Sequence, residues 1–445
     1  MKKKLLAIHL NEFNLDYLTY GSRKYNTKNL KKLLKLSKIK TTTKDKTQNK
    51  DLDPWVQGVS INTGRNSKSH KIFNLGQKIP KNQTQIWDLL SKKKNSCGVW
   101  GTMNSKFKKN NNIKLYFPDP WNFRDKLFPK KLNYLFLLPK YYSKNYLNYS
   151  KLKIFYLSII FLYGVIINNS FLFLIKNFYL FSKIILTKGL KNYVLFFIFD
   201  LISLNIVNKF NQKTKLDFLI VFLNSLAHFQ HNNWDEKKNE KDYFIFVEEI
   251  CKLIFEIKKN YSSLIIFNGF TQKKIKTEFL VRPINPTNFL NYLKIKFEKI
   301  EQDMTNGAFI FFKNRNDLKE SFKILNNYKF FGLNVFSVKK VSEKSIFYKF
   351  KIKFLRENFE FESFSKKTIN KIVDYDISKK VKFKKEFSKL KFSEFISQIH
   401  LIKTTGVHSS EGILFYDNCN IKNKKKNIHN HQIFNLIKNF YNNDM

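Results

Sequence analysis

The sequence predicts an α/β fold in which a mostly parallel sheet is flanked by helices, and two observations lead to that prediction. Short apolar runs with the character of buried strands, such as LLAIHL (5–10), alternate with segments whose apolar residues recur at helical spacing. Polar residues follow the strands directly, as Asn11 and Glu12 follow the first one. Such alternation is typical of a parallel sheet covered by helices, and ligands bind at the strand ends of these sheets.

The first part of the predicted core covers residues 1–120. The elements expected after the first strand are an amphipathic helix at 27–40, an apolar segment ending in a Thr-Gly turn at 54–64, a helix at 84–96 and a buried strand at 97–101. Strand and helix thus follow each other through the whole segment.

Residues 121–210 are expected to form an apolar helical insert or lid. Within it, KIFYLSIIFLYGVIINNSFLFLI (153–175) is long enough to span a membrane. Asn168, Asn169 and Ser170 interrupt this run, and further apolar helical segments follow closely. A buried helical layer is therefore favoured over the alternative of a membrane-contacting surface.

The second part of the core is expected at 211–287. It holds an apolar strand at 217–223 and a helix followed by a strand, Leu264 to Phe267. Short strands and helices at 288–390 predict a small inserted α+β lobe, and 391–445 returns to the core.

The net charge of +48 is discounted as evidence for a charged partner, because lysines are spread along the whole chain together with abundant Asn, Phe, Ile and Tyr. That composition is what codons rich in A and T produce. The run FIFF at 309–312 lacks the glycine-aromatic signature of RNA-binding sheets, so no specific nucleic acid partner is expected. Three widely spaced cysteines predict neither disulfides nor a cysteine zinc site, which favours a reducing, cytoplasmic location.

Polar side chains at the predicted strand ends form a candidate site, because these ends converge on one edge of an α/β sheet. The candidates are Asn11, Glu12, Asp53, Thr63, Asn224, His228, His231, Asn268 and His408. Two or three histidines with an oxygen ligand predict an open zinc site. If 224–232 is helical, Asn224 and His228 share a face, with His231 one turn beyond.

The order of these motifs resembles the alkaline phosphatase superfamily, in particular its phosphodiesterase, nucleotide pyrophosphatase and sulfatase-like branches. LLAIHLNEFNLDYL resembles the opening strand, which ends there in a metal-binding Asp. PWVQGVSINTGRNSKSHKI is similar to the nucleophile segment, with Thr63-Gly64 and His70. NSLAH stands where the family has Asp-x-x-x-His, SSLIIFNGFTQ where it has Ser-Asp-His-Gly, and TTGVHSSEG places His408 at the last metal-binding His. The resemblance covers roughly residues 1–110, 195–285 and 395–430.

The departures from the family pattern concern the metal ligands and the nucleophile. Asn11 stands in place of the first Asp, and Asn224 replaces the Asp of Asp-x-x-x-His. At the Asp-His pair the chain has Gly269 and Phe270, which offer no side-chain ligand. The nucleophile position falls near Asp53-Pro54, without Ser, Thr or Cys. The resemblance therefore implies one divalent-metal site, of the zinc type, while the second is lost.

The ligands implied for the remaining site are His228 and His408, helped by Asn224, His231 or Asn11. A carboxylate from Glu12 or Asp53 is a further candidate ligand. Glu12, Asp53 and Thr63 are the candidates for catalytic roles, with Glu12 or Asp53 as base or nucleophile. The implied function is metal-dependent hydrolysis or transfer at a phosphate or sulfate ester, with an anionic small molecule or sugar ester as substrate. The alternative is a catalytically inactive protein on the same scaffold that binds an anionic ligand or partner.

Overall fold

The computed structural model describes residues 3–47, 50–145, 149–189, 191–302, 306–330, 333–351, 353–354, 395, 397–419 and 427–442. The chain divides into two compact units, one formed by Met1–Lys274 with Gly406–Met445 and the other by Ile275–Thr405. The chain passes between them within β7 (Thr271–Pro283) and β15 (Ile399–Ser409). Much of the predicted α+β lobe, residues 355–394, lies outside the described residues.

The first unit is built on an eight-stranded sheet with the order β17-β2-β16-β6-β1-β5-β3-β4. Its strands are β1 (Leu5–Leu10), β2 (Ser37–Thr42), β3 (Cys97–Trp100), β4 (Ile113–Phe117), β5 (Phe218–Leu223), β6 (Ser263–Phe267), β16 (Glu411–Asp417) and β17 (Asn427–His429). Only β16 runs against its neighbours. The prediction of a mostly parallel sheet is thus confirmed.

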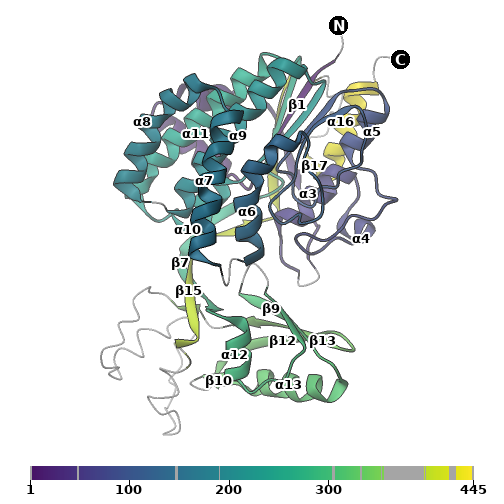
Figure 1. Cartoon of the computed structure of the whole chain (residues 1–445), viewed down its shortest axis with the longest axis vertical. Helices are drawn as coiled ribbons and strands as arrows, with labels where there is room; N and C mark the ends of the chain where they lie inside the picture. The colour runs from purple at the N-terminus through teal and green to yellow at the C-terminus, as the bar shows by residue number, and fades with distance from the viewer. Residues whose placement is uncertain are drawn as a thin grey trace. The chain divides into compact units, whose positions relative to one another are not determined.

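Helices cover both faces of this sheet (Figure 1). Side chains of β1 alternate between two cores, with Leu6, Ile8 and Leu10 on one side and Leu5 and Ala7 on the other. The first side carries α1 (Leu15–Lys24), α2 (Lys28–Leu34), α9 (Asn192–Thr214) and α11 (Lys237–Lys258). The second carries α5 (Ile86–Lys92) and α16 (Gln432–Asn442). Burial on both faces explains why β1, β5 and β6 read as continuous apolar runs.

One local prediction for the first unit was wrong, and one segment without a predicted element proved to be a helix. The expected helix at 27–40 ends at Leu34, because Ile39 and Thr41 alternate inward with exposed lysines and add β2 to the sheet. The segment at 54–64 is the helix α3 (Pro54–Thr63), which is buried along its length. Proline at its first turn and a left-handed Gly64 (φ 67°) after it define its two ends.

The apolar insert forms three consecutive helices, after η1 (Lys130–Leu132): α6 (Asn133–Asn145), α7 (Lys151–Asn168) and α8 (Phe171–Lys188). They precede α9, and the predicted interruption at Asn169 and Ser170 separates α7 from α8. The expectation of a buried layer fails for α7 and α8, since Leu152 is 79% and Leu172 77% exposed. Among the described residues, two helices, α7 and the Tyr193–Thr214 part of α9, are long and apolar enough to cross a membrane, with 22% and 61% of an 18-residue apolar stretch buried.

The second unit has its own core. A four-stranded antiparallel sheet has the order β12-β13-β9-β8, with β8 (Lys299–Gln302), β9 (Gly307–Phe311), β12 (Phe336–Ser342) and β13 (Ser345–Phe350). The helices α12 (Pro286–Tyr292) and α13 (Arg315–Asn327) accompany it. Short pairs β10 (Lys329–Phe330) with β11 (Leu333–Asn334), and β14 (Lys353–Phe354) with β7, complete it. Phe289, Ile310 and Tyr348 lie in this core.

His70 is a buried structural histidine at the end of α4 (Ser67–His70). Its Nδ1 accepts a hydrogen bond from the amide of Ile72 (2.9 Å), so Nε2 carries the proton and donates it to Ser60 Oγ (3.1 Å). Burial lowers the pKa of His70 from 6.5 to about 4, although Asp45 opposes this shift.

This shift predicts a contribution of His70 to acid unfolding. The unfolded chain binds a proton more tightly than the folded one, so the stability is complete above pH 6.5 and is lost as the pH falls towards 4. Measured by urea unfolding, the variant His70→Gln should show a flatter pH dependence over this window. The control is His429→Gln, a change at an exposed histidine of β17, and equal effects of the two substitutions would contradict the role of burial.

Candidate metal centre

The site lies at the edge where the central strands end. β1 pairs in register with β5 and β6, so Leu10, Leu223 and Phe267 come to the same edge. The antiparallel β16 starts at this edge, beside the end of β2, with Glu411 opposite Thr42. Segments that follow β1 and β5 and the segment that precedes β16 are therefore brought together.

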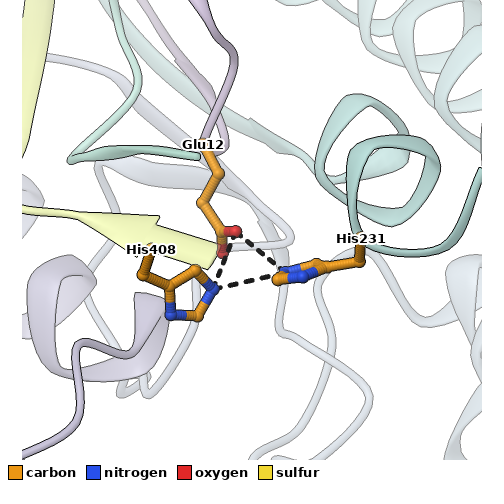
Figure 2. A group of neighbouring side chains, drawn as sticks. All are labelled: Glu12, His231 and His408. Carbon is orange, nitrogen blue, oxygen red and sulfur yellow. Dashed lines mark hydrogen bonds and ion pairs between the residues drawn. The ribbon is translucent and has the colours of Figure 1, made fainter. Parts of the chain in front are cut away.

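Three side chains converge there: Glu12 after β1, His231 from α10 (Ser225–Asn232) and His408 from the end of β15 (Figure 2). Oε2 of Glu12 lies 3.0 Å from Nε2 of His231 and 3.1 Å from Nε2 of His408. The two imidazole nitrogens are 3.3 Å apart. Glu12 is buried, whereas the side chains of His231 and His408 are 31% and 22% exposed, so solvent reaches the cluster from the histidine side.

The carboxylate of Glu12 is held by neutral amides as well as by the histidines. Asn11 Nδ2 donates to Oε1 (2.9 Å) and Gln272 Nε2 to Oε2 (2.6 Å). The backbone of Glu12 is left-handed (φ 55°), which disfavours a residue with a Cβ by about 1–2 kcal/mol. Hydrogen bonds from Gln230 Nε2 to its carbonyl and from its amide to Asn268 O fix this conformation.

The negative charge of Glu12 and the positive charge of His408 stabilise each other. Burial favours the neutral acid of Glu12, but the charges of His408 and His231 and their hydrogen bonds hold its pKa well below the usual value. Burial also opposes protonation of His408, yet Glu12, and to a lesser degree Asp53 and the Leu52 carbonyl, raise its pKa to about 9. Without a metal, His408 is therefore a cation at neutral pH.

The donor set fits a divalent ion of the zinc type. Two imidazole nitrogens and a carboxylate oxygen are the ligand types that zinc takes, and their ligand atoms lie within 4.8 Å of one another. Zinc bonds of about 2.1 Å in a tetrahedron place neighbouring ligand atoms roughly 3.4 Å apart, close to the observed separations. His408 Nδ1 contacts the Leu52 carbonyl, which fixes the tautomer that leaves Nε2 free to bind a metal.

The predicted ligands other than His231 and His408 occupy the surroundings of this cluster. Asn11 Nδ2 donates to Asn224 Oδ1 (2.7 Å). Asn11 Oδ1 and Gln272 Oε1 are both buried without a hydrogen-bond partner among the described residues, so each of these amide oxygens has free lone pairs. The structure places His228 against Phe196, with the ring centroids 3.5 Å apart. Burial and the nearby His231 lower the pKa of His228 to about 3.

Asp53 and Thr63 stand at opposite ends of α3, a helix of ten residues and about 15 Å. Asp53 is the N-cap residue, is buried, and acts electrostatically on His408. Thr63 Oγ1 donates to Val59 O (2.7 Å) within the helix. The structure therefore brings Asp53 close to the cluster and leaves Thr63 away from it.

Residues 268–270, where the resemblance places an Asp-His pair, make packing contacts and hydrogen bonds. Gly269 is left-handed (φ 74°), and the ring of Phe270 lies edge-on against His408 at 4.7 Å between centroids. Asn268 donates to Phe13 O and accepts from the amide of Ile413, which ties β6 to β16. The partners that sequence reasoning missed are Gln230 in α10 and Gln272 in β7, since a single glutamine in a helix or strand carries no motif.

Comparison with known proteins gives structural likenesses only, as no family model and no curated protein sequence matches the chain. Similar solved structures include phosphonoacetate hydrolase from Sinorhizobium meliloti 1021 in complex with phosphonoformate (10% identity, 99% of this chain and 96% of that chain, TM-score 0.46). Murine ectonucleotide pyrophosphatase/phosphodiesterase 5 matches with 10% identity, 99% and 95% coverage and a TM-score of 0.46.

Alkaline phosphatase from the Antarctic bacterium TAB5 matches with 11% identity, full coverage of both chains and a TM-score of 0.40. Likenesses at this level of identity and TM-score say nothing about activity, and the chemistry of the site rests on the residues of this chain.

The cluster predicts one zinc or manganese ion per chain, measurable by elemental mass spectrometry after incubation with the metal and desalting. His231→Ala and His408→Ala should each lower the affinity by more than the 10–100-fold typical of an outer partner. His228→Ala is the matched control, because it removes a histidine from the same helix that stacks on Phe196. Absence of bound metal in the unaltered protein, even with excess zinc, would exclude the metal centre.

Proposed function

We propose that the protein is a metal-dependent hydrolase or transferase that acts on a phosphate or sulfate ester. The observation that carries this proposal is the meeting of Glu12, His231 and His408 at the strand ends of a parallel sheet, with donor atoms spaced as around one metal ion. When bound there, a divalent ion would supply Lewis acidity for the ester oxygen.

The residues around the ion would have two separate roles, metal binding and orientation of the Glu12 carboxylate. Glu12 and the two histidines would hold the ion, and the deprotonation of His408 on metal binding would be offset by the new positive charge. Gln272 and Asn11 would keep the Glu12 carboxylate oriented, because each donates to one of its oxygens. The exposed sides of His231 and His408 leave the ion open to a substrate, as a catalytic site needs.

Asp53 is the proposed base or nucleophile. It is a buried carboxylate at the N-terminus of α3, and its negative charge raises the pKa of His408. The first-turn amides of a helix favour negative charge, which suits both a carboxylate and the anionic group of an ester. Thr63 is not part of this proposal, because its hydroxyl is bonded at the other end of the helix.

The second candidate function is a non-catalytic protein that binds an anionic ligand, and the charge of His408 favours it. With a pKa of about 9, this histidine is a partly exposed cation at neutral pH. Gly269 and Phe270 also offer no ligands for a second ion. The two functions differ in whether a metal is needed and whether product forms.

The assay that tests the first function uses 4-nitrophenyl phosphate, bis(4-nitrophenyl) phosphate and 4-nitrophenyl sulfate with zinc, manganese or magnesium. We expect turnover of at least one ester, with loss of activity in Glu12→Gln because a neutral amide is a poor metal ligand. Thr63→Ala should keep its activity and serves as the matched control.

Asp53→Asn separates the roles at the site. If Asp53 is the base or nucleophile, this variant should lose about 10²–10⁴-fold in kcat while it still binds metal. Unchanged kcat in Asp53→Asn would remove Asp53 from the mechanism. If no ester is turned over, and phosphate binds equally well with and without metal by calorimetry, the binding function is supported instead.

A further inference from the structure

The outer faces of α7 and α8 are apolar and uncovered. In α7 the exposed large apolar side chains are Leu152, Phe155, Tyr156, Ile159, Leu162, Tyr163 and Ile166, each 53–79% exposed. In α8 they are Phe171, Leu172, Ile175, Phe178, Tyr179 and Leu186, each 57–85% exposed. Contiguous exposed apolar surface of this kind marks an interaction site.

The exposed residues of α7 follow helical spacing and lie on one face. The steps from Leu152 to Phe155, Ile159, Leu162 and Ile166 are of three and four residues, which keeps them in a single stripe. The opposite face is packed: Leu157 and Val165 are buried, and a Cβ on Gly164 would lie 2.8 Å from Cβ of Tyr134 in α6. A helix that is apolar all round but covered on one side only has an unfilled contact.

Both helices are fixed to the rest of the first unit, so they do not form a separate membrane span. At the corner between them Asn205 Nδ2 of α9 donates to Asn169 Oδ1 (2.8 Å), and Lys209 Nζ donates to Asn169 O (2.6 Å). Each helix has 18 residues, and α8 contains Lys176 and Lys183. A span needs about 20 apolar residues, whereas a helix lying in the interface keeps one face on protein.

The charges of the sequence segment that carries these faces have one sign, and Lys188 at the end of α8 pairs with Asp242 of α11 (3.1 Å). From Lys126 to Phe199 the sequence holds eleven lysines and no aspartate, glutamate or arginine. Lys151, Lys153, Lys176 and Lys183 are exposed on the two helices themselves. Two copies of such a surface would repel each other, while anionic lipid headgroups would be attracted and the apolar side chains would enter the acyl boundary.

We propose that the outer faces of α7 and α8 seat this protein on an anionic lipid bilayer, with both helices lying in the plane of the interface. The apolar stripes enter the headgroup region, and the lysines reach out to the lipid phosphates along their aliphatic stems. The surface is separate from the metal centre, and the inference holds whether or not the protein is an enzyme.

Flotation of the purified full chain with lipid vesicles tests this proposal. The protein should float with vesicles of phosphatidylcholine mixed with phosphatidylglycerol, float less with phosphatidylcholine alone, and lose binding as salt is raised. Phe155→Ser with Ile159→Ser should lower the bound fraction about tenfold or more, because two apolar side chains no longer leave water. Its matched control is Ile284→Ser with Val341→Ser, which removes two exposed apolar side chains from the second unit.

A second pair of variants tests the charges and does not depend on the apolar substitutions folding well. Lys151→Glu with Lys176→Glu should weaken binding to anionic vesicles, while Lys28→Glu with Lys35→Glu on α2 should not. Failure of the unaltered protein to float with either lipid would overturn the proposal, as would equal flotation of all variants. Sedimentation that shows a dimer abolished by the α7 substitutions would assign these faces to a second copy instead.

Discussion

The ionised carboxylate of Glu12 is the constraint on which the candidate site depends. A buried charge without partners costs several kcal/mol, so the fold has to supply compensating groups. It does so from separate segments: Asn11 beside it, Gln272 in β7, His231 in α10 and His408 in β15. The sheet order makes this convergence possible, because β6, β1 and β5 are neighbours that end at one edge.

The central strands were predictable because burial on both faces leaves an uninterrupted apolar run. The same reasoning failed at 27–40, because lysines between apolar residues suit an amphipathic helix and a strand near the sheet edge equally well. From Ser37 onward the chain forms a strand, because it pairs with β16. Helix α3 was missed because its polar residues Gln57, Ser60 and Asn62 are buried too, so it shows no amphipathic period.

The site was predictable as a collection of strand-end residues, and its internal geometry was not. The i, i+4 spacing puts Asn224 and His228 on one face of α10, but it does not say which direction that face points. The direction depends on contacts of the helix with other parts of the chain. Asp200 of α9 accepts hydrogen bonds from the amides of Asn224 and Ser225 and fixes where the helix starts. Turned in this way, the helix directs His231 to Glu12 and His228 to Phe196. Similarly, α7 and the Tyr193–Thr214 part of α9 are equally apolar, so the sequence could not tell which of them is buried.

Because His408 follows the second unit in the sequence, it is synthesised long after Glu12, and the site cannot be completed until then. Glu12 leaves the ribosome early, and its histidine partners lie far along the chain; His408 follows His231 by 177 residues and Leu52 by 356. The 131 residues of Ile275–Thr405 alone take roughly 7–26 s to make at about 5–20 residues per second. During that interval the nascent first unit holds an incompletely compensated carboxylate and lacks β16, so β6 is an open sheet edge. The insertion thus delays the pairing of β6 with β16, and with it the completion of the site, until the second unit has been made.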